Sequence, residues 1–210
     1  MKTTIKIAVI AMMVISSSMK AQTTEKRFDF GVKSGGNISN IINSYPLPSS
    51  MGINHKIGFY FGGFVNIRFS EKLKLQPELL YSNQGYNAEY FHREINFNYD
   101  YKFRQTQSYI YLPIVLQYYF LTKMNVELGM QAGYFISSRR KVTETSLSNG
   151  EGQTSSDLSD SDRFDFGFNL GAGYDLNEHL RINVRYSLGV ININDFSKTS
   201  VWSLGLEYKI

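Results

Sequence analysis

The chain ends on Ser203-Leu-Gly-Leu-Glu-Tyr-Lys-Ile210, a stretch in which apolar and polar residues alternate. Successive side chains of a β-strand point to opposite faces, so Leu204, Leu206, Tyr208 and Ile210 share an apolar face. Trp202 extends that face, and the opposite face carries Ser203, Gly205, Glu207 and Lys209. The same two-sided pattern recurs about eight times upstream, which indicates a sheet whose strands each meet an apolar medium on one side.

The N-terminus has a different character. Lys2 and Lys6 precede an apolar run from Ile7 to Ile15, and serines lead from there to Ala21. A run of about nine residues is too short to cross a bilayer, which needs roughly 20. We therefore expect residues 1-21 to be a cleaved signal peptide and residues 22-210 to form one outer-membrane β-barrel domain.

Charge and cysteine content exclude several classes of function. Removing Lys2, Lys6 and Lys20 with the leader lowers the formal net charge from +4 to +1 (4 − 3), which offers no basis for nucleic-acid binding. The absence of cysteine excludes disulfides and thiolate metal sites. Stability must therefore come from backbone hydrogen bonds and from apolar burial.

Alternation places eight strands in the mature chain. They are expected at 27-36, 56-70, 73-86, 103-120, 125-138, 163-176, 179-191 and 200-210. The pattern is clearest at 163-176, where Phe164, Phe166 and Phe168 alternate with polar residues or glycine. It is ambiguous only at 103-120, where aromatic residues occur in both registers. We favour the register with Ile110 outward, because it turns Gln117 inward.

The connections alternate as well. Short turns at 70-72, 121-124 and 177-179 are separated by the longer segments 37-55, 87-102, 137-162 and 192-199. Short periplasmic turns and long outer loops are typical of outer-membrane barrels. The sequence thus predicts an all-β, eight-stranded antiparallel up-and-down transmembrane β-barrel in the outer membrane, surrounded by lipid and with both termini periplasmic. A sheet edge cannot be left unpaired in hydrocarbon, so the first and last strands must pair.

The inward register carries charged residues of both signs in equal number. We expect them to form a lumen charge network, consisting of Asp29, Lys33, Arg68, Lys74, Glu78, Glu127, Asp165, Asp175, Arg181, Arg185, Glu207 and Lys209. Charges inside a narrow barrel are costly unless they pair and accept or donate hydrogen bonds. We interpret the set as a plug of the lumen. A proton or ion path and a polar ligand pocket are the alternatives.

Outward aromatic rings suit the headgroup zone of a membrane. We place Tyr81, Tyr86, Tyr109, Tyr118, Tyr134, Tyr174, Tyr186, Trp202 and Tyr208 there. The tyrosine-rich segment around residues 86-101 is expected to extend its hairpin above the membrane, although it could instead be a loop that contacts an external partner.

No catalytic, metal or cofactor site is expected. His55, His92 and His179 have no ligand spacing, although His92 could join Asp100 in a catalytic site at the loop rim. The acidic residues Asp157, Asp160 and Asp162 face Arg139, Arg140 and Lys141 within one long connection, but they lack the glycine and distal glutamate of a calcium-binding EF-hand loop. We interpret them as parts of a solvated loop, and the chain as not an enzyme.

Five strand sequences resemble the PorT-like outer-membrane β-barrel family of Bacteroides-type bacteria. They are Phe30-Gly-Val-Lys-Ser-Gly-Gly-Asn-Ile-Ser-Asn40, Leu75-Gln-Pro-Glu-Leu-Leu-Tyr-Ser-Asn-Gln-Gly85, Tyr111-Leu-Pro-Ile-Val-Leu-Gln-Tyr-Tyr-Phe120, Phe166-Gly-Phe-Asn-Leu-Gly-Ala-Gly-Tyr-Asp-Leu176 and Arg185-Tyr-Ser-Leu-Gly-Val-Ile-Asn-Ile-Asn-Asp195. One member of that family is associated with a secretion system for surface proteins. The family has no agreed catalytic or binding residues to transfer to this chain.

The resemblance also implies a C-terminal signal for the barrel-assembly machinery, a partner during biogenesis. Ser203, Gly205, Tyr208 and Ile210 are similar to that signal, although a terminal isoleucine replaces the more common phenylalanine. 

Three functions remain open from the sequence. The first is a sealed, non-enzymatic barrel whose loops 37-55, 87-102 and 137-162 serve structural or surface-interaction roles, with extracellular or secretion-system partners. The second is a narrow channel or transporter for small solutes or ions. The third is a soluble periplasmic barrel of lipocalin type, which would require an apolar lumen and a polar exterior.

Overall fold

A computed structural model describes residues 27–43, 51–94, 97–145, 153–154, 163–190 and 197–210. The signal peptide expected at residues 1–21 and its cleavage after Ala21 lie outside these residues. Within the described part of the chain, no helix is long and apolar enough to cross a membrane.

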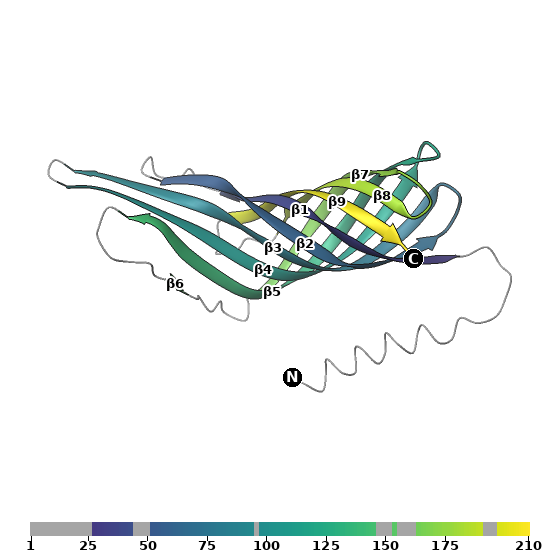
Figure 1. Cartoon of the computed structure of the whole chain (residues 1–210), viewed down its shortest axis with the longest axis horizontal. Coiled ribbons are helices and arrows are strands. Elements are labelled where there is room, and N and C mark those ends of the chain that lie inside the picture. Colours follow the sequence, from purple (N-terminus) through teal and green to yellow (C-terminus); the bar gives the residue numbers. More distant parts are fainter. Residues whose placement is uncertain (1–26, 44–50, 95–96, 146–152, 155–162, 191–196) are drawn as a thin grey trace, which may run out of the picture.

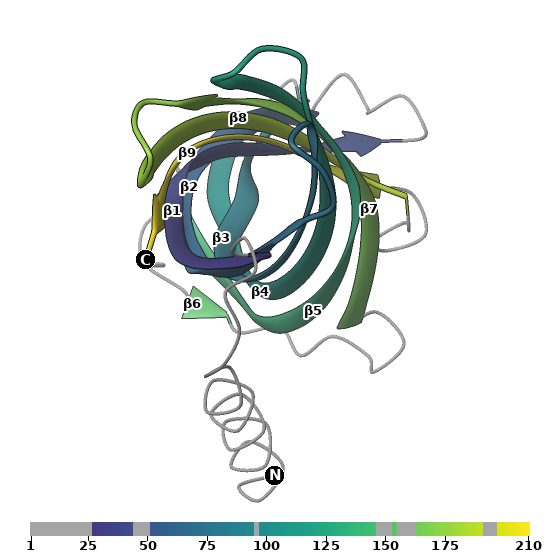
Figure 2. The same ribbon diagram turned by 90° about the vertical axis from the view of Figure 1, so that its right-hand side faces the viewer.

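Eight long strands form one closed antiparallel sheet (Figures 1 and 2). Their bounds are β1 Phe28–Asn43, β2 Met51–Arg68, β3 Leu73–Glu94, β4 Phe97–Tyr119, β5 Met124–Thr145, β7 Phe164–Asp175, β8 Leu180–Gly189 and β9 Ser197–Lys209. The two-residue strand β6, Gln153–Thr154, pairs with the edge of β5. Each long strand pairs with its neighbours in the chain, so the up-and-down topology is confirmed.

Pairing of the first strand with the last closes the ring. The register of β1 and β9 runs from Gly31 opposite Lys209 to Asn43 opposite Ser197, and the Ile210 amide donates to the Phe30 carbonyl at 2.8 Å. The start of β1 and the end of β9 therefore lie at the same end of the barrel as the three short turns (Figure 1).

The two faces of the sheet differ as the alternation predicts. Along β7, Phe164, Phe166, Phe168 and Leu170 are exposed on the outside, while Asp165 and Asn169 are buried inside. The register favoured for β4 is also confirmed, because Ile110 is exposed and Gln117 is fully buried. An apolar exterior with a polar interior is the reverse of a lipocalin, so that hypothesis is wrong for this chain.

The strands are longer than expected at the end opposite the short turns. Large parts of the predicted connections 37-55, 87-102 and 137-162, and Ser197–Thr199 of 192-199, belong to strands, and β3 pairs with β4 up to Glu94 opposite Phe97. We call residues 51–56, 84–94, 97–108 and 137–145 of β2 to β5 the extension (Figure 1). A strand that extends beyond the membrane into water can continue through polar residues. Polarity alone therefore predicted strand ends that lie too close to the membrane.

Register shifts mark the base of the extension. β2 and β3 shift between His55 and Phe59, near Gly85, whose φ is 144°. The Ser39 hydroxyl accepts from the Gly85 amide at 2.9 Å and donates to the Gly85 carbonyl at 2.8 Å. The Ser39 side chain thus takes the place of the backbone hydrogen bonds between β2 and β3 that the register shift interrupts. A side chain at Gly85 would also overlap the Gln105 carbonyl, which makes glycine necessary there.

Two of the aromatic residues assigned to the outer face lie inside. Tyr109 is buried, because it shares its strand face with Tyr111 and Val115, and the exposure of Ile110 fixes that register. Tyr86 shares a face with buried Ser82, Gln84 and Ala88, and its ring lies 6.3 Å from that of buried Phe103. The outward assignment was wrong for these two residues.

The apolar exterior gives a direct test. Leu170 lies mid-strand and is 61% exposed, whereas Leu121 is 57% exposed in a short turn. In phospholipid vesicles, Leu170→Arg should lower the free energy of unfolding by about 2–4 kcal/mol, and Leu121→Arg by about 0–1 kcal/mol, because the cost of a charge depends on depth. Guanidinium unfolding measures both. Equal costs would mean that lipid does not surround this face.

Candidate functional site

The interior contains a cluster of charged side chains contributed by strands from all around the ring. Lys33 comes from β1, Glu78 from β3, Glu127 from β5, Arg181 and Arg185 from β8, and Glu207 from β9. All six are buried, and we call them the central cluster. Each lies on the inward register that the alternation predicts, so six of the twelve expected residues meet in one place.

Ion pairs connect the members of the central cluster. Arg185 binds both carboxylate oxygens of Glu78 at 2.8 Å and Glu127 Oε2 at 2.8 Å. Lys33 Nζ lies 2.8 Å from Glu207 and 3.3 Å from Glu78. Arg181 Nη1 lies 3.4 Å from Glu207. Three basic and three acidic residues therefore balance to zero formal charge.

Side-chain amides join the ion pairs into a continuous network. Gln76 Nε2 donates to Glu78 at 2.9 Å and to Glu207 at 3.2 Å. Gln117 Nε2 donates to Glu127 at 3.1 Å, and Gln117 Oε1 accepts from Arg181 at 3.0 Å. Asn66 Nδ2 donates to Gln76 Oε1 at 2.8 Å. No role in the lumen network was expected of Gln76, Asn66 or the Gln117 amide. Their inward register, shared with Glu78 and Arg68, was the signal that could have identified them.

Four more of the expected residues lie near the short-turn end. Arg68 pairs with Asp29 at 3.6 Å, and Lys209 with Asp175 at 3.7 Å, while Asp175 also pairs with Arg181 of the central cluster. The Arg68 side chain is 39% exposed, so its pair is weaker than those inside.

Lys74 and Asp165 depart from the expected pairing. Lys74 Nζ lies 4.2 Å above the Tyr119 ring, a cation–π contact. Asp165 is buried, yet no basic side chain in the described ranges forms an ion pair with it; it accepts from the Tyr111 hydroxyl at 2.8 Å. Alternation predicts the face of a side chain but not its height in the barrel, which is why the network excludes Asp165.

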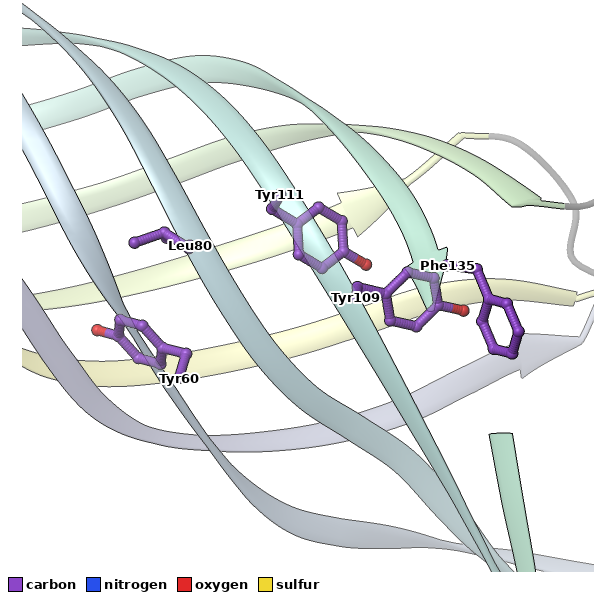
Figure 3. Close-up of a cluster of buried hydrophobic side chains, with 5 residues drawn as sticks. All are labelled: Tyr60, Leu80, Tyr109, Tyr111 and Phe135. Carbon is purple, nitrogen blue, oxygen red and sulfur yellow. The ribbon is translucent and has the colours of Figure 1, made fainter. Parts of the chain in front are cut away.

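A layer of large side chains fills another level of the lumen. Tyr60, Leu80, Tyr109, Tyr111 and Phe135 project inward (Figure 3). Tyr109 stacks on Tyr111 with ring centroids 5.3 Å apart, and its ring meets Phe135 edge-on. A cavity of about 30 Å³ is lined by Tyr60, Leu80 and Tyr111 of this layer and by Lys33 and Arg185 of the central cluster. The volume is on the scale of one water molecule.

Inward glycines make room for these rings. A Cβ atom at Gly205 would overlap the Tyr60 hydroxyl, and one at Gly133 would overlap the Tyr111 ring. Glycine at these positions therefore relieves crowding on the inner face of a tightly curved sheet.

The extension has an aromatic inner face. Tyr90 stacks on Phe103 at 6.0 Å, and the Arg140 guanidinium lies 4.6 Å from the centre of the same ring. Burial raises the pKa of the Tyr86 hydroxyl. Burial, together with the positive charge of Arg104, lowers the pKa of Lys56 at the base of the extension.

The described residues contain no group of three or more His, Cys, Asp or Glu placed to hold a metal. The exposed His55 backbone carbonyl accepts from Asn87, and the His179 ring stacks on Tyr208 at 6.1 Å. The side chains of His92 and Asp100, and residues Asp157, Asp160 and Asp162, lie outside the described part.

The C-terminal residues adopt the faces that the sequence predicts. Tyr208 and Ile210 are exposed on the apolar exterior, whereas Gly205 is buried in the lumen and Ser203 lines the cavity. Their recognition by the barrel-assembly machinery stays a prediction.

The burial of the central cluster can be tested by comparing alanine variants of a buried arginine and of a more exposed one. The Arg185 side chain is only 6% exposed. Arg185→Ala should lower the free energy of unfolding by about 3–5 kcal/mol, because it leaves buried carboxylates without a partner. Arg68→Ala should cost less than about 1 kcal/mol, as an exposed pair does. Similar costs for both variants, measured by denaturant unfolding in vesicles, would contradict a buried network.

Comparisons with known structures find barrels of similar extent. Ail, the attachment invasion locus protein of Yersinia pestis, solved with the heparin analogue sucrose octasulfate, is 13% identical and has a TM-score of 0.47; the match covers 88% of this chain and 99% of that chain. Neisserial surface protein A is 14% identical with a TM-score of 0.47, covering 86% and 97%. OprG from Pseudomonas aeruginosa is 14% identical with a TM-score of 0.41, covering 89% and 97%.

Among curated proteins, none matches this chain. The sequence model of one protein family, described as outer membrane protein beta-barrel domain, matches residues 20–195, which is most of the chain. With a closed eight-stranded sheet and an apolar exterior, the chain belongs to the outer membrane protein beta-barrel domain family.

Proposed function

We propose that this outer-membrane protein is a sealed, non-enzymatic barrel that presents the extension for structural or surface-interaction roles. The observation that carries the proposal is the central cluster, in which ion pairs and amides connect β1, β3, β4, β5, β8 and β9 across the lumen. A narrow channel would need a continuous wet path. The paired side chains and the adjoining layer line a cavity of only about 30 Å³, which is on the scale of one water molecule.

The proposed orientation places both termini and the short turns in the periplasm and the extension outside the cell. It is supported by the short turns at one end and the long strands at the other, an asymmetry typical of outer-membrane barrels. The extension would then be available to extracellular or secretion-system proteins.

Planar-bilayer recording tests the sealed lumen. We expect no stable conductance steps from the wild-type protein, because the buried, ion-paired side chains of the central cluster occupy the lumen. A double variant, Tyr60→Ala with Tyr111→Ala, removes two rings of the adjoining layer but keeps the central cluster, so it should stay silent as well. Protease protection of the inserted protein confirms that molecules are present. Reproducible unitary steps from the wild type would favour the channel.

Crosslinking tests the role of the extension. Deleting residues 87–102 joins Tyr86 to Phe103, and since Tyr86 already pairs with Gln105, Phe103 and Arg104 become a two-residue hairpin turn. Proteins crosslinked at the surface of cells with the full-length chain should be lost from cells with the shortened chain. Equal surface amounts of both forms serve as the control. An unchanged set of crosslinked proteins would show that the hairpin is not the contact.

A further inference from the structure

Three basic residues gather on the outer face of the extension. Arg104 of β4 lies opposite Lys141 of β5, and Arg139 lies opposite Thr106 one step nearer the barrel. All three side chains are exposed. Arg139 and Lys141 are two residues apart and thus share a face, so Arg104, Arg139 and Lys141 form one patch, which we call the basic patch.

The basic patch continues the lipid-facing surface of the barrel. Tyr134 and Ile136 are exposed on the outside of β5, and the register shift between Ser108 and Tyr109 of β4 keeps Arg139, three residues after Ile136, on the same side. At about 3.3 Å per residue and a tilt of about 45°, Arg139 and Lys141 lie about 7 and 12 Å beyond the last apolar side chain. Lipid headgroups begin within several ångströms of the hydrocarbon, so the basic patch lies at the level of the headgroups and points outward toward them.

Among the described residues, the direct cross-strand partners of the basic patch carry no negative charge. The cross-strand partners of Arg104 are Asn87 and Lys141, and Lys141 also pairs with Gln153. Lys102, one step further out, instead lies opposite Glu89 and Glu144. Like charges directly opposite each other destabilise a sheet, so the contact between Arg104 and Lys141 favours an anion between them.

The hydrogen bond from Arg104 Nε to Asn87 Oδ1, at 3.1 Å, anchors the guanidinium on this face. Arginine binds phosphate oxygens through a planar fork, and lysine adds a point charge. Basic clusters beside a membrane-spanning segment attract anionic headgroups.

We propose that the basic patch binds the phosphate groups of lipid in the leaflet at the extended end of the barrel. In the orientation proposed above, that lipid is the phosphorylated glycolipid of the outer leaflet. The inference rests on insertion in the membrane in that orientation and not on whether the lumen is sealed.

Native mass spectrometry of delipidated protein tests the proposal, with bis-phosphorylated lipid A as the probe. The variant Arg104→Gln, Arg139→Gln, Lys141→Gln should bind lipid A about a hundredfold more weakly than the wild type, the scale expected for three basic residues at an anionic surface. A control variant loses the same charge at the short-turn end through Arg27→Gln, Lys72→Gln, Lys123→Gln, and should bind as the wild type does. If the triple variant at the patch does not fold, Lys141→Gln alone should still weaken binding.

Further arms distinguish the source of the phosphate and the competing occupant. Dephosphorylated lipid A should not be retained, and millimolar inorganic phosphate should not displace lipid A. Displacement by inorganic phosphate would indicate a site for the free ion and overturn the proposal. So would lipid A binding that appears only after Asp157→Asn, Asp160→Asn and Asp162→Asn, because acidic residues of the same chain would then occupy the patch. Equal retention by the wild type and the triple variant would also overturn it.

Discussion

The structure depends on one constraint: within hydrocarbon, every backbone N–H and C=O group must find a partner in the protein. A sheet meets this requirement only when its edges join, which here occurs where β1 pairs with β9 along the length of both strands. Once the ring is closed, every strand has one face toward the surrounding medium and one toward the axis. The alternation of apolar and polar residues follows directly, because the two faces meet opposite environments.

Closure creates a second requirement, since a narrow interior must accommodate the polar face of every strand. The central cluster meets it with charges that balance and with amides that bridge them. These contacts join strands that are not neighbours in the sheet, such as β3 with β8, where Glu78 meets Arg185. A buried ion pair is weak evidence for added stability, whereas its demand for specific partners can fix which strands face each other and in what register.

Much of this organisation follows from the sequence, because a period of two needs no knowledge of tertiary contacts. The faces of Phe166, Gln117 and Arg185 could all be predicted from their positions alone. Which inward side chains pair across the lumen could not be predicted, because that depends on the tilt and shear of the strands. Asp165 was therefore expected in the network but meets Tyr111 instead, and Gln76 was overlooked. The length of the strands in the extension was underestimated. Outside the membrane a strand needs no apolar face, so the alternation of apolar and polar residues is weak there, as in Tyr86 to Tyr90.

The balance of the central cluster has an electrical consequence. A potential difference across a membrane does work on charge that is displaced along the field, at about 2.3 kcal/mol per elementary charge per 100 mV. Lys33, Arg181 and Arg185 are tied to Glu78, Glu127 and Glu207, so movement of the group as a unit carries no net charge. A potential difference across the membrane, such as a Donnan potential, therefore does no net work on the central cluster when it moves as a unit.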